Sequence, residues 1–415
     1  MVVLAKSPVA GSVKTRLSPT FTPREAAALA SAAIRDTLDA VAAAAPRHTV
    51  VAWDGPPASW LPASATVIAQ RGQGLAERLE NVFADLLTPD DDRPTLLVGM
   101  DTPQLTGADL GISWEGADAV LGLCEDGGYW AIGFRRHHPG AILGVPMSTP
   151  RTGADQLGRL HAMGLRVRLL PRMTDVDLPA DARLVADLAP DSRFGRLHRR
   201  LVATPCDPMA LFEAAMAGAD VHARFDGAHA VCRILEVSSW VAMSPADDLL
   251  VSRCEPPVLD VGCGPGRFVE ALAARGIAAL GVDVSRDAVA RTSGRGGCAL
   301  ARDVHERLPG EGRWGTVVLA DGNIGIGGDP LGLLRRCREL LGPGAVALVE
   351  TSPHDGESAE AMLTLHEAHG RSSHPVPWAV VGTTRLVELA HRAGFVAVEH
   401  WRADGRAFVA LRPAG

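Results

Sequence analysis

The chain of 415 residues is long enough for two to three domains, and its 47% hydrophobic and 21% charged residues exclude a disordered or fibrous protein. The formal net charge of −7 argues against a general nucleic-acid partner, no apolar run reaches the roughly 18 residues of a membrane span, and no signal-peptide pattern opens the chain. Seven cysteines form no C-x-x-C pair, which fits a reducing compartment, so we expect a cytoplasmic protein without a disulfide scaffold or membrane partner.

The first half of the chain predicts alternating strands and helices. A short apolar strand at residues 1–5 leads into a loop at residues 6–15 that contains glycine, serine and proline. Thr22, Pro23 and Glu25 are typical of an N-cap, a first-turn proline and a capping-box acid. A second helix is expected over residues 75–86, and further strands at 48–53, 95–99, 119–123, 130–134 and 165–170. This alternation predicts an α/β layer structure with a mainly parallel sheet.

A basic segment at residues 193–200, followed by the stretch 204–208, predicts a domain boundary. We therefore expect one domain at residues 1–203 and a second at 204–415. Residues 209–255 are expected to be helical and irregular, and to cover an acceptor pocket.

A second α/β series begins at Val258. It ends in two strands, 395–401 and 407–411, which the turn between them joins into a terminal antiparallel hairpin. The predicted fold class is therefore α/β, with two doubly wound domains.

The second series opens with a glycine-rich loop, VLDVGCGPGRF, over residues 258–268. Its spacing is G-x-G-x-G, whereas a dinucleotide-binding loop has G-x-G-x-x-G. About 20 residues later a strand ends in Asp283, which is placed to accept a hydrogen bond from a ribose hydroxyl. Two further strands are expected to end at Asp303 and Asp321.

Taken together, residues 230–415 resemble the class I S-adenosylmethionine-dependent methyltransferases. The resemblance implies that S-adenosylmethionine is the cofactor and that its methionine end is lined by Asp260, Gly262, Cys263, Gly264 and Gly266. It also implies that Asp283 holds the ribose, that Asp303 lies near the adenine, and that Asp321 faces the methionine moiety or the acceptor. Neither the acceptor nor a catalytic base is identified, and a domain that only senses S-adenosylmethionine is the alternative.

The first domain contains both lysines of the chain, Lys6 and Lys14, in one loop that also carries Gly11 and Arg16. Backbone amides, lysine and arginine at the end of a first strand suit a di- or triphosphate. The loop is not a P-loop, because G-x-x-x-x-G-K-S/T is absent.

Acidic residues follow three later strands of this domain. A strand is expected to end at Asp101 within the motif GMDTP, and the segment EDGGYW spans residues 125–130. Asp175 and Asp177 lie in DVDLP, with Asp181 shortly after. Carboxylates are suitable ligands for Mg²⁺ or Mn²⁺.

The lysine loop and G-x-D-x-P resemble the GT-A nucleotide-diphospho-sugar transferases, and within them the DUF2064 family, over residues 1–200. The resemblance implies that phosphates contact Lys6, Gly11, Lys14 and Arg16. It implies that Asp101 and Asp177 hold Mg²⁺ or Mn²⁺. The sugar or acceptor would be lined by Asp126, Gly127, Gly128 and Tyr129. Because Asp101 is isolated and not part of a D-x-D motif, glycosyl transfer and nucleotidyl transfer both remain open.

The sequence therefore predicts a bifunctional transferase. A nucleotide sugar donates a glycosyl group, and S-adenosylmethionine donates a methyl group, to small-molecule acceptors. In one alternative the first domain transfers a nucleotidyl group and releases pyrophosphate. In another it is a non-catalytic nucleotide-binding module attached to an active methyltransferase. The sugar, the base, both acceptors and the oligomeric state are not predicted.

Overall fold

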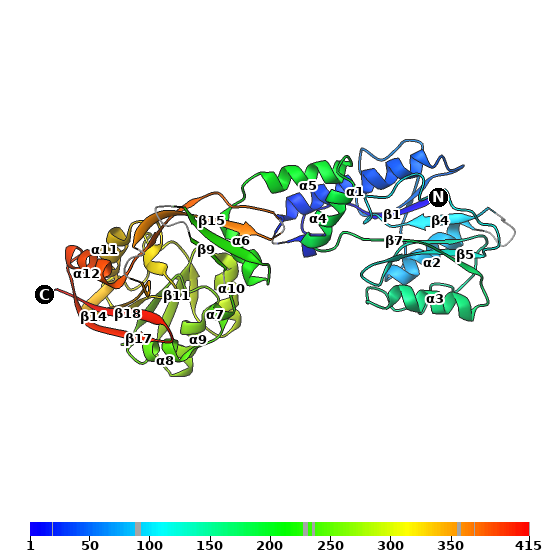
Figure 1. Ribbon diagram of the computed structural model, residues 1–415. Coiled ribbons are helices and arrows are strands. Elements are labelled where there is room, and N and C mark those ends of the chain that lie inside the picture. Colours follow the sequence, from blue (N-terminus) through cyan, green and yellow to red (C-terminus); the bar gives the residue numbers. More distant parts are fainter. Residues whose placement is uncertain are drawn as a thin grey trace. The chain divides into compact units, whose positions relative to one another are not determined.

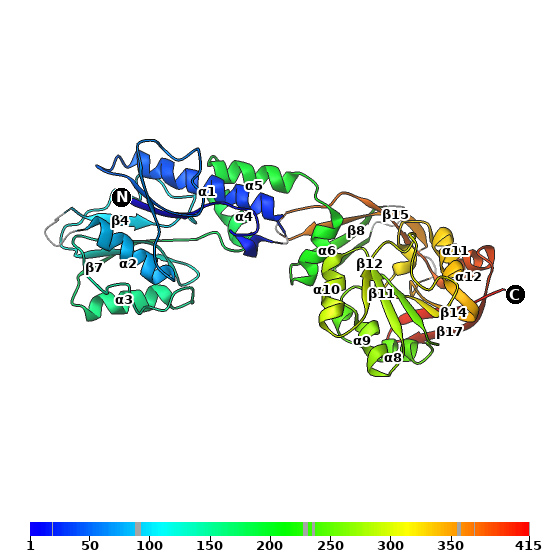
Figure 2. The same cartoon turned by 180° about the vertical axis from the view of Figure 1, so that it is seen from behind.

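The computed structural model describes residues 1–18, 20–87, 93–226, 231–234, 237–354, 358–368 and 370–414 (Figures 1 and 2). The chain divides into two units, Met1–Thr204 and Pro205–Gly415. Both have a mainly parallel sheet between helices, so the α/β prediction is confirmed. No described helix is both long enough and apolar enough to cross a membrane.

The first unit contains a seven-stranded sheet in the order β3-β2-β1-β4-β6-β5-β7. Among its described strands, only β6 runs against its neighbours, because it pairs antiparallel with β4 and with β5. The carboxyl ends of β4, β5 and β7 therefore point to the same edge. The strands are β1 Val2–Lys6, β2 Val50–Asp54, β3 Thr66–Ala69, β4 Thr95–Val98, β5 Ala119–Cys124, β6 Tyr129–Phe134 and β7 Val167–Met173.

Helices cover both faces of this sheet (Figure 1). Helix α1 (Pro23–Ala43) packs on one face, and α2 (Leu75–Leu86) and α3 (Thr152–Ala162) pack on the other. The capping box at the start of α1 is confirmed, since Thr22 Oγ1 accepts from Glu25 N and Glu25 Oε2 accepts from Thr22 N.

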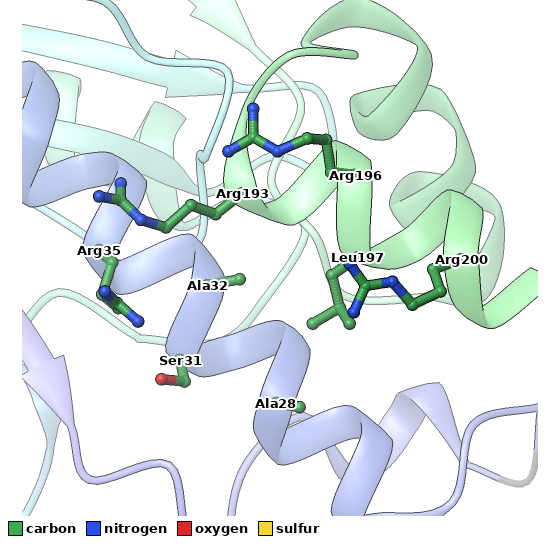
Figure 3. A pocket seen from close by; sticks show the side chains of 8 residues that line it. All are labelled: Ala28, Ser31, Ala32, Arg35, Arg193, Arg196, Leu197 and Arg200. Atoms are coloured by element: carbon green, nitrogen blue, oxygen red, sulfur yellow. The ribbon is translucent and has the colours of Figure 1, made fainter.

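Two further helices, α4 (Pro179–Leu188) and α5 (Arg193–Ala203), share a small core with α1. The buried Asp36 of α1 fixes the start of α5 by accepting hydrogen bonds from the backbone of Arg193 and Phe194. Figure 3 shows the groove between α1 and α5, which is lined by Ala28, Ser31, Ala32, Arg35, Arg193, Arg196, Leu197 and Arg200.

The second unit contains another seven-stranded sheet, in the order β12-β11-β10-β13-β14-β18-β17. Strand β18 pairs antiparallel with both β14 and β17, so the predicted terminal hairpin is present. The strands are β10 Val258–Val261, β11 Ala279–Asp283, β12 Ala299–Ala301, β13 Trp314–Leu319, β14 Leu341–Thr351, β17 Phe395–Ala403 and β18 Arg406–Pro413.

Two pairs of helices cover this second sheet. Helices α8 (Pro245–Val251) and α9 (Arg267–Ala274) pack on one face. Helices α11 (Pro330–Leu340) and α12 (Thr383–Arg392) pack on the other. Helix α10 (Arg286–Gly294) follows β11.

A separate four-stranded antiparallel sheet, in the order β16-β15-β8-β9, corrects one prediction. Residues 209–255 were expected to be helical and irregular, but they include two strands as well as the helices α6 (Pro208–Met216) and α7 (Val237–Val241). Strand β8 forms because it pairs with β15, about 140 residues later in the chain, from Met362↔Asp226 to Glu367↔Val221. The strands are β8 Val221–Asp226, β9 Val231–Ile234, β15 Ala359–Glu367 and β16 Val376–Val380.

Candidate functional site

In the first unit, Lys14 lies against the carboxylates that the sequence predicts as metal ligands. Its ammonium nitrogen is 2.6 Å from Asp101 Oδ1 and 3.5 Å from Asp177 Oδ1, and it donates to the carbonyl of Val176. The Lys14 side chain is only 8% exposed. Burial by itself would lower the pKa of Lys14, but the neighbouring carboxylates of Asp101 and Asp177 raise it above its usual value. Lys14 is therefore a charged side chain neutralised by acids.

The other residues expected to contact phosphate are more exposed. Arg16 Nη1 lies 3.0 Å from Asp177 Oδ2, so it too pairs with an expected metal ligand. Lys6 Nζ donates to the carbonyl of Ser12, and Gly11 lies on the exposed part of the loop. The structure thus brings Lys14 and Arg16, but not Lys6, onto the acidic residues.

A second group of possible metal ligands lies beside these acids. Ligand atoms of Cys124, Asp126 and Asp175 all lie within 4.8 Å of one another. The pKa of Asp175 is raised to about 6, mainly by burial and then by the charge of Asp126. Burial, with Asp175 and Asp126, also raises the pKa of the Cys124 thiol. We call Asp101, Cys124, Asp126, Asp175 and Asp177 the acidic cluster.

The acidic cluster is formed at one edge of the sheet. Asp101 follows β4, Cys124 ends β5, and Asp175 follows β7. Carboxylate oxygens at such spacings fit a divalent cation, whose oxygen ligands lie at about 2.0–2.6 Å. Asp181 lies outside the cluster, because its carboxylate accepts from the backbone of Leu178 and Asp177 and so caps α4.

The turn after β5 positions Asp126. Its Oδ1 accepts from the backbone of Gly128. A Cβ atom at Gly127 would lie 1.9 Å from the carbonyl oxygen of Pro150, so a side chain does not fit there. The hydroxyl of Tyr129 is directed to Met147 Sδ at 3.8 Å, and burial raises the pKa of Tyr129.

In the second unit, the glycine-rich loop after β10 leaves an open space. At Gly266 an added Cβ would lie 2.5 Å from the side chain of Thr292, and at Gly262 it would lie 2.5 Å from Asn323 Nδ2. At Gly264, where φ is +52°, no atom lies within 4 Å of an added Cβ. The loop is therefore packed at both ends and accessible at Gly264, where a ligand can approach the backbone.

Asp283 fixes this loop from the neighbouring strand. Its Oδ2 accepts from Gly264 N at 2.9 Å, and its Oδ1 accepts from Ser285 N at 2.8 Å. Burial raises the pKa of Asp283, although these two hydrogen bonds act in the opposite direction and lower it. Ser285 Oγ in turn contacts Glu213 Oε1 of α6 at 3.3 Å, and Asp303 is exposed and accepts from His305 N.

Asp260 lies fully buried beneath the loop. Its Oδ2 has no hydrogen-bond partner among the residues that the structure describes. Burial raises the pKa of Asp260 to about 7, with Arg267 opposing the increase and Asp321 adding to it. Cys263 is also buried, and its thiol donates weakly to the carbonyl of Gly264.

Asp321 belongs to a network of ion pairs. Arg267 binds its two carboxylate oxygens at 2.7 and 2.9 Å, and Arg406 lies 3.3 Å away. Both arginines also pair with Asp247, and Arg406 pairs with Glu350 at 2.6 Å. We call these five residues the ion-pair network. The Asp321 carboxylate, expected to face the methionine moiety or the acceptor, is thus already held by two arginines.

Two family models match the chain. Residues 28–149 match the DUF2064 model, which is described as an uncharacterized protein conserved in bacteria. Residues 235–400 match the model of a methyltransferase domain. The chain carries a DUF2064 region and a methyltransferase domain. A search of the curated proteins found no match.

Similar solved structures cover the two parts of the chain separately. A putative nucleotide-diphospho-sugar transferase from Desulfovibrio desulfuricans is 24% identical, with a TM-score of 0.43, over 48% of this chain and 93% of its own. A SAM-dependent methyltransferase from Bacteroides fragilis is 21% identical, with a TM-score of 0.43, over 50% of this chain and 95% of its own. The CcbJ methyltransferase from Streptomyces caelestis is 20% identical, with a TM-score of 0.34, over 41% of this chain and 88% of its own.

Several residues of both sites are absent from the sequence prediction. In the DUF2064 region the missed residue is Cys124, whose position at the end of a buried strand beside EDGG was a usable signal. In the second unit Asp247 lies shortly before the glycine loop, but Glu213 and Arg406 lie far from it along the chain. No local pattern marks them.

Proposed function

We propose that the chain is a bifunctional transferase. Its methyltransferase domain uses S-adenosylmethionine to methylate a small molecule, and its DUF2064 region transfers a glycosyl group from a nucleotide sugar with the help of Mg²⁺ or Mn²⁺. The observation that carries the glycosyl transfer is the acidic cluster, which lies at the carboxyl ends of three strands beside Lys14, whose side chain is only 8% exposed. Ligands of open α/β sheets bind at this edge.

In the first reaction the chain's residues position a diphosphate. Asp101, Asp126, Asp175 and Asp177 would hold the cation, which neutralises charge on the departing nucleoside diphosphate. Arg16, which is largely exposed, is available to a phosphate oxygen. Burial and the charge of Asp126 raise the pKa of Asp175, and a bound cation would favour the ionised form of this carboxyl group.

In the second reaction the open backbone at Gly264 would lie against the cofactor. Asp283 orients that backbone, and the unpartnered oxygen of Asp260 suits the positive charge of S-adenosylmethionine. The bound cofactor supplies a methyl group on a sulfonium, and holding the acceptor in line with it accounts for much of the acceleration.

A nucleotide panel tests the first activity. Wild type, Asp101→Asn and the control Asp155→Asn are incubated with NTPs or NDP-sugars and Mn²⁺, and NDP and pyrophosphate are followed by chromatography. Asp155 is a suitable control because it forms a surface pair with Arg151 on α3. We expect slow NDP release from one NDP-sugar, lost only in Asp101→Asn. Pyrophosphate release from an NTP would instead favour nucleotidyl transfer, and no cation-dependent turnover with unchanged methyl transfer would favour a binding module.

Calorimetry with S-adenosylmethionine tests the second activity. Gly264→Ala places a methyl group in the open space, while Gly276→Ala adds one at another left-handed, open glycine beyond the end of α9. We expect Gly264→Ala to weaken binding at least tenfold and Gly276→Ala to leave it unchanged. Equal effects would mean that backbone strain, and not a ligand at Gly264, explains the loss.

A further inference from the structure

We infer that Lys14 is a counter-ion built into the acidic cluster, which neutralises Asp101 and Asp177 in place of a divalent cation and is displaced when that cation binds. This inference rests on the proposed metal-dependent function. It adds a regulatory role, because the cation and the nucleotide phosphates would then bind together.

The contacts of Lys14 are those of a bound cation. Its ammonium lies 2.6 Å from Asp101 and 3.5 Å from Asp177, and a third oxygen comes from the carbonyl of Val176. The ammonium thus lies among three protein oxygens, two from carboxylates and one from a carbonyl, as a bound cation would. The side chain is 8% exposed, whereas Asp101 and Asp177 are 40% and 37% exposed. The lysine therefore approaches from inside the protein and leaves the outer sides of both carboxylates accessible.

The backbone directs the side chain inward. Lys14 has φ 48°, a left-handed conformation that side-chain-bearing residues adopt only at a cost. Lys6, on the same loop, ends a regular strand, and its exposed ammonium contacts the carbonyl of Ser12. Of the two lysines, only Lys14 contacts carboxylates in the described structure.

A divalent cation on Asp101 and Asp177 would lie close to this ammonium. Both carboxylates would have to serve two cations that repel each other at short distance beside a largely buried side chain. The repulsion is relieved when Lys14 moves to a diphosphate. Cation and diphosphate therefore increase each other's affinity, because such coupling is reciprocal.

Titration with Mn²⁺ alone tests the inference, using calorimetry on wild type, Lys14→Met and the matched control Lys6→Met. We expect Lys14→Met to bind Mn²⁺ at least tenfold more tightly than wild type, and Lys6→Met to match wild type. Equal or weaker binding by a folded Lys14→Met would overturn the inference. Absence of Mn²⁺ binding to all three proteins would overturn the metal-dependent function as well, so the two failures are distinguishable.

A measurement on wild type needs no variant. Lysine acetylation by acetic anhydride is followed by mass spectrometry with and without saturating Mn²⁺, and Lys6 serves as the internal control. We expect Mn²⁺ to increase the rate at Lys14 at least threefold and to leave Lys6 unchanged. An unchanged rate at Lys14 in a protein that binds Mn²⁺ would overturn the inference.

Discussion

The two units both place carboxylates at the carboxyl edge of a parallel sheet, but they balance the charge differently. In the first unit Lys14 pairs with the partly exposed Asp101 and Asp177, and the exposed Arg16 pairs with Asp177 as well. In the second, Asp247 and Arg267 are only 1% and 4% exposed and pair permanently inside the protein. Under our proposal the exposed carboxylates of the first unit exchange one cation for another, whereas the buried network of the second unit has both partners inside the protein.

Breaking the buried network has the largest expected effect. Asp247→Asn leaves Arg267 and Arg406 without one shared carboxylate, and losing one partner of a buried pair costs about 3–5 kcal/mol. We expect the free energy of unfolding, measured by urea denaturation, to fall by this amount. The neighbouring Asp248→Asn is the control, since Asp248 forms an exposed pair with Arg275 and its loss costs less than about 1 kcal/mol. Similar losses for both variants would show that the network contributes no more than a surface pair.

A smaller expected effect is a pH dependence of the affinity for S-adenosylmethionine, which arises from Asp260. Its pKa is raised to about 7 by burial, so it is mostly protonated below pH 7 in the free protein. A cationic ligand favours the ionised form, so binding below pH 7 must release a proton. We expect affinity for S-adenosylmethionine, measured by calorimetry, to fall up to about tenfold per pH unit below 7.

Asp260→Asn cannot ionise and provides the control for that pH dependence. Its affinity is expected to be lower than that of wild type at pH 8, with no change between pH 8 and pH 6. A wild-type affinity that stays constant over this range would show that Asp260 does not face the ligand.

The smallest expected change in the free energy of unfolding comes from breaking an exposed ion pair in the first unit. Arg166 binds both carboxylate oxygens of Asp118 and lowers the pKa of Asp118 to about 2. Since this pKa lies below that of the unfolded chain, the pair stabilises the protein above about pH 4, and the stabilisation is lost as pH falls toward 2. We expect Asp118→Asn to lower the free energy of unfolding by about 0.5–1 kcal/mol at pH 7 and by nothing near pH 2, as thermal unfolding would show. A cost at pH 7 as large as that of Asp247→Asn would remove the contrast between exposed and buried pairs.

Local sequence patterns were sufficient to predict many of the strands of both seven-stranded sheets. The capping box of Thr22 and Glu25 was predictable because its partners are three residues apart. The glycine loop was predictable because its chemistry lies within one strand–turn–helix segment. By contrast, β8 depends on pairing with β9 and with the distant β15, and the sequence prediction missed it although Val221, Ala223 and Phe225 alternate with polar residues.

Charge pairing was decided by the tertiary structure alone. From the sequence we predicted that Lys14 contacts phosphate and that Asp101 and Asp177 hold a metal ion. The structure brings Lys14 onto Asp101 and Asp177, which follow it by 87 and 163 residues in the chain. Likewise Asp181, considered for a metal site, caps a helix, and Arg406 reaches Asp247 from the far end of the chain. A residue's type fixes which interactions it can make, but the partner it meets depends on the packing of distant strands and loops.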